Sequence, residues 1–243
     1  MFEAIKNKFQ FKFKDRIAAA NILAAALIDT ITKEELANNP VSVLGIPRGG
    51  VVLADVIATK LKASHFDLVI PRKLTIPNNE EAAFGAIMSD GTIYIDYRIV
   101  KDLDITYDYI EKEKSRQLQE IERRYTLYAQ HKPNEEFVNK IGSQRATTTT
   151  ILVDDGAASG ATMIAAARSV RKAIATNSKL IIAIPVAPRD TVTNLLRNEA
   201  DHIEVVMKPS FFSSVGQYYK NFEAVNDDKV IDIMKNERHR QLT

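Results

Sequence analysis

Two adjacent aspartates, Asp154 and Asp155, end an apolar segment and are followed by a run of small residues. The stretch reads ILVDDGAASGAT, from Ile151 to Thr162. Small side chains let several backbone N–H groups turn toward one point, and such a concavity at the start of a helix binds anions. Ser159 adds a hydroxyl donor. We therefore predict a phosphate site in this loop, formed by Gly156, Ala157, Ala158, Ser159, Gly160, Ala161 and Thr162.

The carboxylates next to this loop narrow the type of ligand. A carboxylate beside a phosphate is repulsive unless it contacts something else, such as sugar hydroxyls or a cation. The loop does not match a P-loop, because Gly156 and Gly160 are too close together and no lysine follows, and the dinucleotide fingerprint of three spaced glycines is absent. A sugar phosphate is the ligand that fits. The other role open to Asp154 and Asp155 is that of a helix cap or turn.

Two further groups of residues follow predicted strands and carry positive charge. The sequence PRGG, formed by Pro47, Arg48, Gly49 and Gly50, follows the first strand, and Arg72 and Lys73 end the second. The carboxyl ends of parallel strands share one edge of a sheet, so we expect these cations to face the same ligand. The alternatives are a solvated loop arginine and a surface pair at a strand end.

The elements that must position these residues alternate between strand and helix. This order predicts a doubly wound α/β fold with a mainly parallel sheet and right-handed crossovers. The expected strands are Val41–Pro47, Phe66–Lys73, Thr148–Val153, Lys179–Pro188 and His202–Met207. The expected helices are Asp15–Ile28 with Asp15 as N-cap, a helix from Val51, Tyr107–Gln130, Thr162–Ala175, Arg189–Ala200 and a short helix near the C-terminus.

One segment, about residues 74–96, interrupts this alternation. Pro77 to Asn79 mark a loop, and Asp90-Gly91 marks a hairpin turn between two short apolar runs. A polar connection, residues 131–146, follows the charged helix. We expect a single domain over residues 1–243, with an inserted hairpin at about 74–96 and an aromatic-rich tail at about 208–243.

The composition excludes several classes of function. Lys and Arg number 33 against 31 Asp and Glu, and this net charge of +2 is too small for a nucleic-acid footprint over the whole molecule. The absence of cysteine excludes disulfides and thiolate sites. The longest apolar run near the start, IAAANILAAALI, is too short to span a bilayer, and the first residues lack the apolar core of a secretory signal. We expect a cytoplasmic protein without a membrane partner.

The stretch ILVDDGAASGAT resembles the signature of type I phosphoribosyltransferases, in which an acidic pair between a strand and a small-residue loop binds phosphoribosyl pyrophosphate (PRPP). The resemblance implies that residues 156–162 hold the 5-phosphate and that Asp154 and Asp155 reach the ribose hydroxyls. It also implies a pyrophosphate loop at Pro47–Gly50, catalytic cations at Arg48, Arg72 and Lys73, and a mobile flap at 74–96. Mg²⁺ would be chelated by PRPP and contact Asp154 and Asp155 only indirectly. The resemblance further implies a homodimer. In some relatives a peptide near the residue matching Arg48 is cis.

The acceptor of such a transfer has a weaker signature. The resemblance implies a C-terminal hood, and the tail aromatics could stack on an acceptor or simply hold the tail on the core. These aromatics are Phe211, Phe212, Tyr218 and Tyr219, with Phe222 after them. A regulator that senses PRPP or a nucleotide and contacts RNA or DNA is an alternative to an enzyme, and a dimeric scaffold whose PRPP site only stabilises it is a third. The charged stretch 111–145 holds eight Lys or Arg against six Glu, which indicates a solvated face rather than a nucleic-acid surface.

Overall fold

A five-stranded parallel sheet forms the centre of the computed structural model, which describes residues 11–31, 39–129 and 148–242. Its strand order is β2-β1-β6-β7-β8. The strands are β1 (Val41–Gly45), β2 (His65–Leu68), β6 (Thr149–Val153), β7 (Lys179–Val186) and β8 (His202–Met207). Every residue of β1 and β6 is buried, as expected of parallel strands that are covered on both faces. The predicted parallel sheet is confirmed.

Helices cover both faces of this sheet. They are α2 (Arg16–Thr30), α4 (Gly49–Leu61), α8 (Ala161–Ala173), the π-helical turn η1 (Thr191–Leu196) and α9 (Asp227–Leu242). Alternate strand residues enter two separate cores: Val43 and Ile151 pack in the core with α2 and α4, and Leu44 and Leu152 pack in the core with α8 and η1. The doubly wound arrangement is therefore confirmed. The predicted helix at 189–200 is a π-helical turn over a shorter range.

The first helix begins where its cap predicts. The side chain of Asp15 accepts a hydrogen bond of 2.8 Å from the backbone N–H of Ala18, as an N-cap does. This cap makes Arg16 the first residue of α2.

The inserted segment forms a second, antiparallel sheet. Its strands, in the order β3-β4-β5, are β3 (Arg72–Ile76), β4 (Asn79–Ile87) and β5 (Ile93–Ile95). The predicted hairpin at Asp90-Gly91 joins β4 to β5 and is confirmed. The predicted second strand is wrong at its end, because β2 stops at Leu68 and Arg72 begins β3. Pro71, which has no N–H to donate to a ladder, lies at this break.

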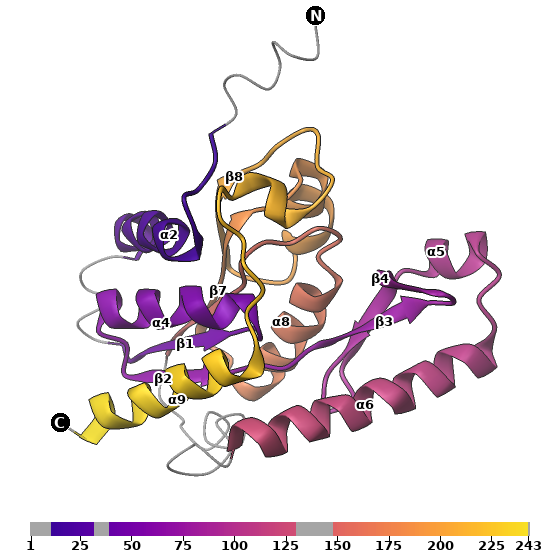
Figure 1. Ribbon diagram of the computed structural model, residues 1–243, viewed down its shortest axis with the longest axis horizontal. Coiled ribbons are helices and arrows are strands. Elements are labelled where there is room, and N and C mark those ends of the chain that lie inside the picture. The colour runs from indigo at the N-terminus through magenta and orange to yellow at the C-terminus, as the bar shows by residue number, and fades with distance from the viewer. Residues whose placement is uncertain (1–10, 32–38, 130–147, 243) are drawn as a thin grey trace, which may run out of the picture.

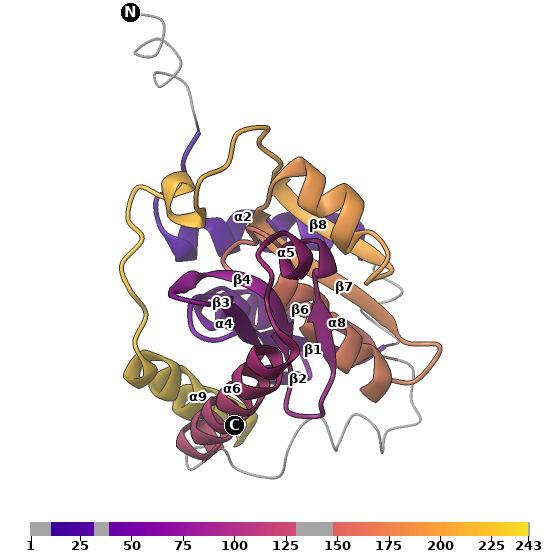
Figure 2. The same ribbon diagram turned by 90° about the vertical axis from the view of Figure 1, so that its right-hand side faces the viewer.

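This three-stranded arm projects from the main sheet and lies along α6 (Tyr107–Ala129), with α5 (Tyr97–Asp102) at its far end (Figure 1). Figure 2 shows α9 beside α6, where the hydroxyl of Tyr128 donates a 2.6 Å hydrogen bond to Asp227 Oδ1. The connection predicted at 131–146 lies outside the described residues. No helix among the described residues is long and apolar enough to cross a membrane.

The order of the strands creates a switch point between β1 and β6. From β1 the chain crosses through α4 to β2 on one side, and from β6 it crosses through α8 to β7 on the other. The loops that leave the carboxyl ends of β1 and β6 therefore diverge and leave a crevice between them, which is where open α/β sheets bind ligands.

Candidate functional site

A pocket of about 550 Å³ lies at this switch point. It brings together the predicted loop after β6, the predicted loop after β1 and the cations at the base of the arm. Its lining residues are Arg16, Ile46, Pro47, Arg48, Gly49, Pro71, Arg72, Lys73, Thr75, Glu80, Arg124, Asp154, Asp155, Gly156, Ala157, Ala158, Ser159, Gly160, Ala161, Thr162, Val215, Phe222, Ala224 and Val225. Of the residues predicted to contact PRPP, Gly50 alone does not line it.

The loop after β6 presents free backbone donors to the pocket. Within the described parts of the chain, the N–H groups of Ala158, Ser159 and Gly160 donate no hydrogen bond. Gly160 has a φ of +77°, a conformation that favours glycine, and it directly precedes the first residue of α8. Unpaired N–H groups at a helix N-terminus, together with the helix dipole, form an anion site.

A second helix also begins at the pocket. Helix α4 starts at Gly49, and the exposed Arg48 stands at its N-cap position without capping it. The peptide bond between Pro47 and Arg48 is cis. Two helix N-termini and the Arg48 guanidinium thus share the pocket, and all three favour negative charge in the ligand.

The two glycines after Arg48 allow the two loops to touch. A Cβ atom on Gly49 would lie 1.9 Å from Asp155 Oδ2, and one on Gly50 would lie 2.7 Å from the Cα of Asp154. Gly50 therefore lets α4 approach the end of β6, a packing role that places it behind the pocket wall. Gly49 leaves room for the carboxylate of Asp155.

The two aspartates have different surroundings. Asp154 Oδ1 accepts a hydrogen bond of 2.8 Å from the N–H of Asp155, and burial raises the pKa of Asp154 well above its ordinary value, as does the charge of Asp155. Burial also raises the pKa of Asp155, but Arg16 opposes the rise, since Arg16 Nε lies 2.8 Å from Asp155 Oδ2. Asp155 thus has a cationic partner, whereas Asp154 forms no ion pair with the described residues.

Arg16 is a site residue that the sequence did not reveal. Besides its ion pair with Asp155, its Nη1 donates a 2.7 Å hydrogen bond to the carbonyl of Glu223, and its guanidinium carbon lies 3.8 Å from the ring centroid of Phe222. Arg16 thereby joins α2, the β6 loop and the C-terminal tail. Its partner Asp155 is 139 residues away along the chain, so no local pattern could have paired them.

The predicted tail aromatics differ in how far the structure buries them. Phe211 is exposed, and the ring of Phe212 stacks on that of Tyr218 at 5.5 Å. Tyr218 and Tyr219 are buried, and the Tyr219 hydroxyl donates a 2.6 Å hydrogen bond to the carbonyl of Asp155. Burial of this hydroxyl raises its pKa. Tyr218 and Tyr219 therefore hold the tail on the core, which was the other role considered for them.

The tail residues that do face the pocket come slightly later in the chain. They are Phe222, Ala224 and Val225, with Val215 before them. All four are apolar, so this wall suits a flat or apolar group.

Cations outnumber carboxylates around the pocket. Arg16, Arg48, Arg72, Lys73 and Arg124 line it, against Asp154, Asp155 and Glu80. Arg72 Nε donates to Gln117 Oε1 at 2.9 Å, and Lys73 Nζ donates to the carbonyl of Glu81 at 3.4 Å. Burial lowers the pKa of Arg72, and the charge of Arg124 lowers it further. This balance suits a ligand with several negative charges.

Two basic residues of α6 that lie away from the pocket are paired with carboxylates. Lys114 contacts Glu111 at 2.8 Å and Arg123 contacts Glu120 at 2.7 Å. Along the described part of stretch 111–145, this pairing agrees with a solvated face.

The chain matches the phosphoribosyl transferase domain over residues 14–207. It is 33% identical over 219 residues to two curated proteins of Mycobacterium tuberculosis, from strains CDC 1551 and H37Rv, each named "Putative phosphoribosyl transferase". These alignments cover 90% of this chain and 45% of each relative, so the chain spans about half the length of these relatives. A crystal structure from Thermus thermophilus, that of TT1426, is similar with a TM-score of 0.69 and 32% identity, over 93% of this chain and 99% of that one.

Proposed function

Because this chain belongs to the phosphoribosyl transferase family, as its match over residues 14–207 shows, we propose that it transfers the 5-phosphoribosyl group of PRPP to a small acceptor. Pyrophosphate is the leaving group. The observation that carries this proposal is the pocket itself, in which free N–H groups, an acidic pair and a cluster of cations face one another.

The loop after β6 is suited to the 5-phosphate of PRPP. The unpaired N–H groups of Ala158, Ser159 and Gly160 would donate to phosphate oxygens, and the dipole of α8 adds favourable potential. Asp154 and Asp155 precede these donors by a few residues and line the same pocket, where they would contact the ribose hydroxyls. A carboxylate accepts hydrogen bonds from two adjacent hydroxyl groups, so the pair is suited to the sugar.

The opposite side of the pocket is suited to the pyrophosphate. Arg48, Arg72 and Lys73 are cations there, and the N-terminus of α4, which begins at Gly49, adds favourable potential for an anion. In the reaction, the bond from the anomeric carbon to the pyrophosphate oxygen breaks and its electron pair leaves with pyrophosphate. A lone pair of the acceptor forms the new bond, and the acceptor's proton passes to solvent. The cations stabilise the charge that develops on the leaving group.

The arm and the apolar tail wall would complete the site. Thr75 and Glu80 of the arm line the pocket, so a movement of β3 and β4 toward it would exclude water, which competes with the acceptor. The wall formed by Val215, Phe222, Ala224 and Val225 would receive a flat acceptor such as a nucleobase.

Asp154 and Asp155 fit an indirect Mg²⁺ site. The described residues contain no group of three or more His, Cys, Asp or Glu side chains that could hold a metal alone. Mg²⁺ is commonly bound through one or two carboxylates together with substrate phosphates, which is the donor set that PRPP and this pair would supply. When bound, the ion would neutralise charge on the pyrophosphate.

Release of pyrophosphate from Mg-PRPP tests this proposal, with nucleobases and other small acceptors supplied one at a time. We expect release with at least one acceptor, and a large loss of rate in Asp155→Asn because the sugar contact is weakened. Glu80→Gln, at an exposed carboxylate on the rim of the same pocket, is the matched control and should change the rate little.

Two results would contradict the proposed transfer. If Asp155→Asn and Glu80→Gln had equal, small effects, the sugar contact would be wrong. If Mg-PRPP bound but no acceptor released pyrophosphate, the protein would be a PRPP-sensing regulator instead of a transferase.

A further inference from the structure

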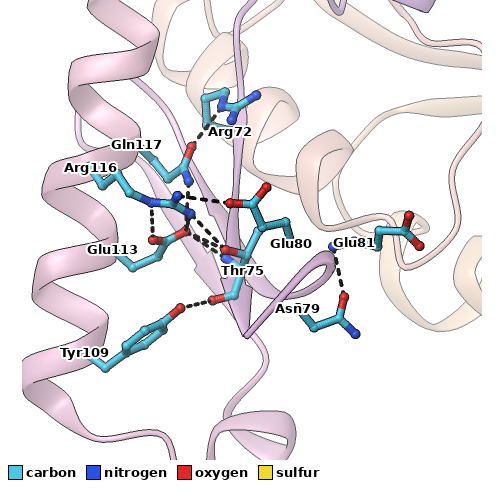
Figure 3. A network of polar contacts seen from close by, with 9 residues as sticks. All are labelled: Arg72, Thr75, Asn79, Glu80, Glu81, Tyr109, Glu113, Arg116 and Gln117. Atoms are coloured by element: carbon cyan, nitrogen blue, oxygen red, sulfur yellow. Dashed lines mark hydrogen bonds and ion pairs between the residues drawn. The ribbon is translucent and has the colours of Figure 1, made fainter. Parts of the chain in front are cut away.

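A polar network links helix α6 to strand β3 beside the pocket (Figure 3). At its centre is Glu113, whose side chain is 4% exposed. Its carboxylate accepts five hydrogen bonds, from Thr75 N at 3.0 Å, Thr75 Oγ1 at 2.8 Å, Gln117 Nε2 at 2.8 Å, Arg116 Nε at 2.8 Å and Arg116 Nη2 at 3.0 Å. We call Glu113, Arg116 and Gln117 the α6 clamp.

The carboxylate of Glu113 is ionised within this network. Burial opposes ionisation, but the hydrogen bonds from Arg116, Thr75 and Gln117 outweigh it and hold the pKa of Glu113 below its ordinary value. An ionised carboxylate only accepts hydrogen bonds. Its neighbours must therefore turn their donors toward it.

This requirement fixes the orientation of the Gln117 amide. Gln117 is buried, and its Nε2 must donate to Glu113, so its Oε1 is directed the other way. That oxygen accepts the 2.9 Å hydrogen bond from Arg72 Nε. The Arg72 side chain makes no other hydrogen bond or ion pair with the described residues, so both of its Nη groups are available to a ligand.

The clamp also holds the strand that carries Arg72. Thr75 lies on β3 three residues after Arg72, and α6 holds its N–H and its hydroxyl through Glu113. The hydroxyl of Tyr109, also on α6, donates a 3.0 Å hydrogen bond to the carbonyl of Thr75. Helix α6 thus holds both the Arg72 side chain and, through Thr75, the strand that carries it, as Figure 3 shows.

We propose that Glu113 and Gln117 are positioning residues that hold the Arg72 guanidinium in place for the leaving pyrophosphate. This inference rests on the proposed function. A guanidinium binds phosphate through a planar pair of N–H groups, so its orientation matters as much as its charge. An arginine side chain without a hydrogen-bond partner loses rotamer freedom when it binds a ligand, and this loss weakens binding. The contact with Gln117 orders the Arg72 side chain before the ligand arrives.

Inorganic pyrophosphate is the probe that tests this proposal, by isothermal titration with Mg²⁺ present. We expect Gln117→Leu to weaken pyrophosphate binding ten- to hundredfold, because small misplacements of a positioned group have effects of this size. Gln119→Leu, an exposed glutamine on the same helix, is the matched control and should leave binding unchanged.

A double-mutant cycle separates positioning from general damage to the fold. In an Arg72→Met background, Gln117→Leu should change pyrophosphate binding less than twofold, because its effect acts through Arg72. An equal effect of Gln117→Leu in both backgrounds, or no effect in the wild-type background, would overturn the proposal. If Gln117→Leu does not fold, Gln117→Asn keeps the amide but shortens its reach, and the same criteria apply to it.

A measurement without ligand provides an independent readout. In ¹⁵N NMR spectra, the Arg72 Nε–H signal, identified by its loss in Arg72→Met, should be protected from solvent exchange in wild type and exposed in Gln117→Leu. Equal exchange in both proteins would contradict the contact.

The binding results also distinguish this inference from the proposed function. A wild-type protein that binds pyrophosphate but not PRPP would refute the proposed function. The double-mutant cycle of Arg72 and Gln117 would still decide whether Gln117 positions Arg72. A wild-type protein that binds neither ligand would refute both.

Discussion

Replacing Arg16 by leucine should destabilise the protein strongly, because this side chain joins three separate parts of the chain. The side chains of Arg16 and Asp155 are 11% and 15% exposed, and Arg16 Nε and Asp155 Oδ2 are 2.8 Å apart. Removing one partner of a buried pair leaves the other charge uncompensated, which costs about 3–5 kcal/mol. Since Asp155 retains some contact with the pocket, we expect a loss near the lower limit, about 3 kcal/mol of unfolding free energy. For a chain of 150–250 residues this corresponds to a fall in Tm of roughly 6–12 °C.

The pH dependence of this loss is a second prediction from the same change. Without Arg16, burial would raise the pKa of Asp155 further in the folded protein. The unfolded chain then releases the proton at lower pH than the folded one, so the variant loses stability as pH rises from 3.8 through the raised value. The deficit relative to wild type should therefore be larger at neutral pH than near pH 4.

Urea unfolding at neutral and acidic pH measures both effects. Arg98→Leu is the matched control, since Arg98 forms a 3.0 Å ion pair with Asp96 but its own side chain is 80% exposed. We expect no measurable change there, as for many surface ion pairs. Arg16→Lys should fall between wild type and Arg16→Leu, because lysine keeps the charge without the planar fork. An Arg16→Leu protein as stable as Arg98→Leu would show that the buried ion pair of Arg16 with Asp155 does not stabilise the fold.

Two more substitutions test the floor of the pocket. Gly49→Ala places a Cβ atom 1.9 Å from Asp155 Oδ2, which Arg16 holds in place. We expect this contact to lower the unfolding free energy, measured with urea, by about 1–3 kcal/mol. Gly91→Asn is the control and should be tolerated, because Gly91 lies in an open turn with a φ of +77° that asparagine can adopt. Asp154→Asn should stabilise the ligand-free protein at neutral pH by about 1–2 kcal/mol, because it removes a buried carboxylate whose pKa is raised, and it should weaken binding of Mg-PRPP. The stabilisation should be absent below pH 3.8, where both folded and unfolded chains carry the proton, and should grow as pH rises toward the raised pKa; a gain that is the same at all pH values would contradict it.

The loops at the carboxyl ends of β1 and β6 were predictable because their signals are local. A buried strand, two carboxylates and a run of small residues lie within residues 151–162, and the sheet topology alone brings Arg48 to the same edge. The parallel order of the strands and the cap at Asp15 follow from equally local patterns.

The contacts that complete the pocket were not predictable, because they join distant parts of the chain. Arg16 looks like any polar residue in the first turn of a helix, and Gln117 looks like a solvated position on a charged helix. The tail composition did not distinguish a buried Tyr219 from Phe222, which faces the pocket, since both are aromatic. Strand β3, the first of the arm, was missed because the break at Pro71 falls within an otherwise continuous extended segment.

The proposed function requires that the pocket between β1 and β6 binds PRPP. Isothermal titration of the full chain with PRPP and Mg²⁺ tests it most directly, with Gly160→Val as the comparison, because a side chain at its φ of +77° would distort the phosphate loop. We expect saturable binding with one site per chain, lost or strongly weakened in Gly160→Val. Absence of binding by the wild-type protein, or equal binding by both proteins, would contradict it.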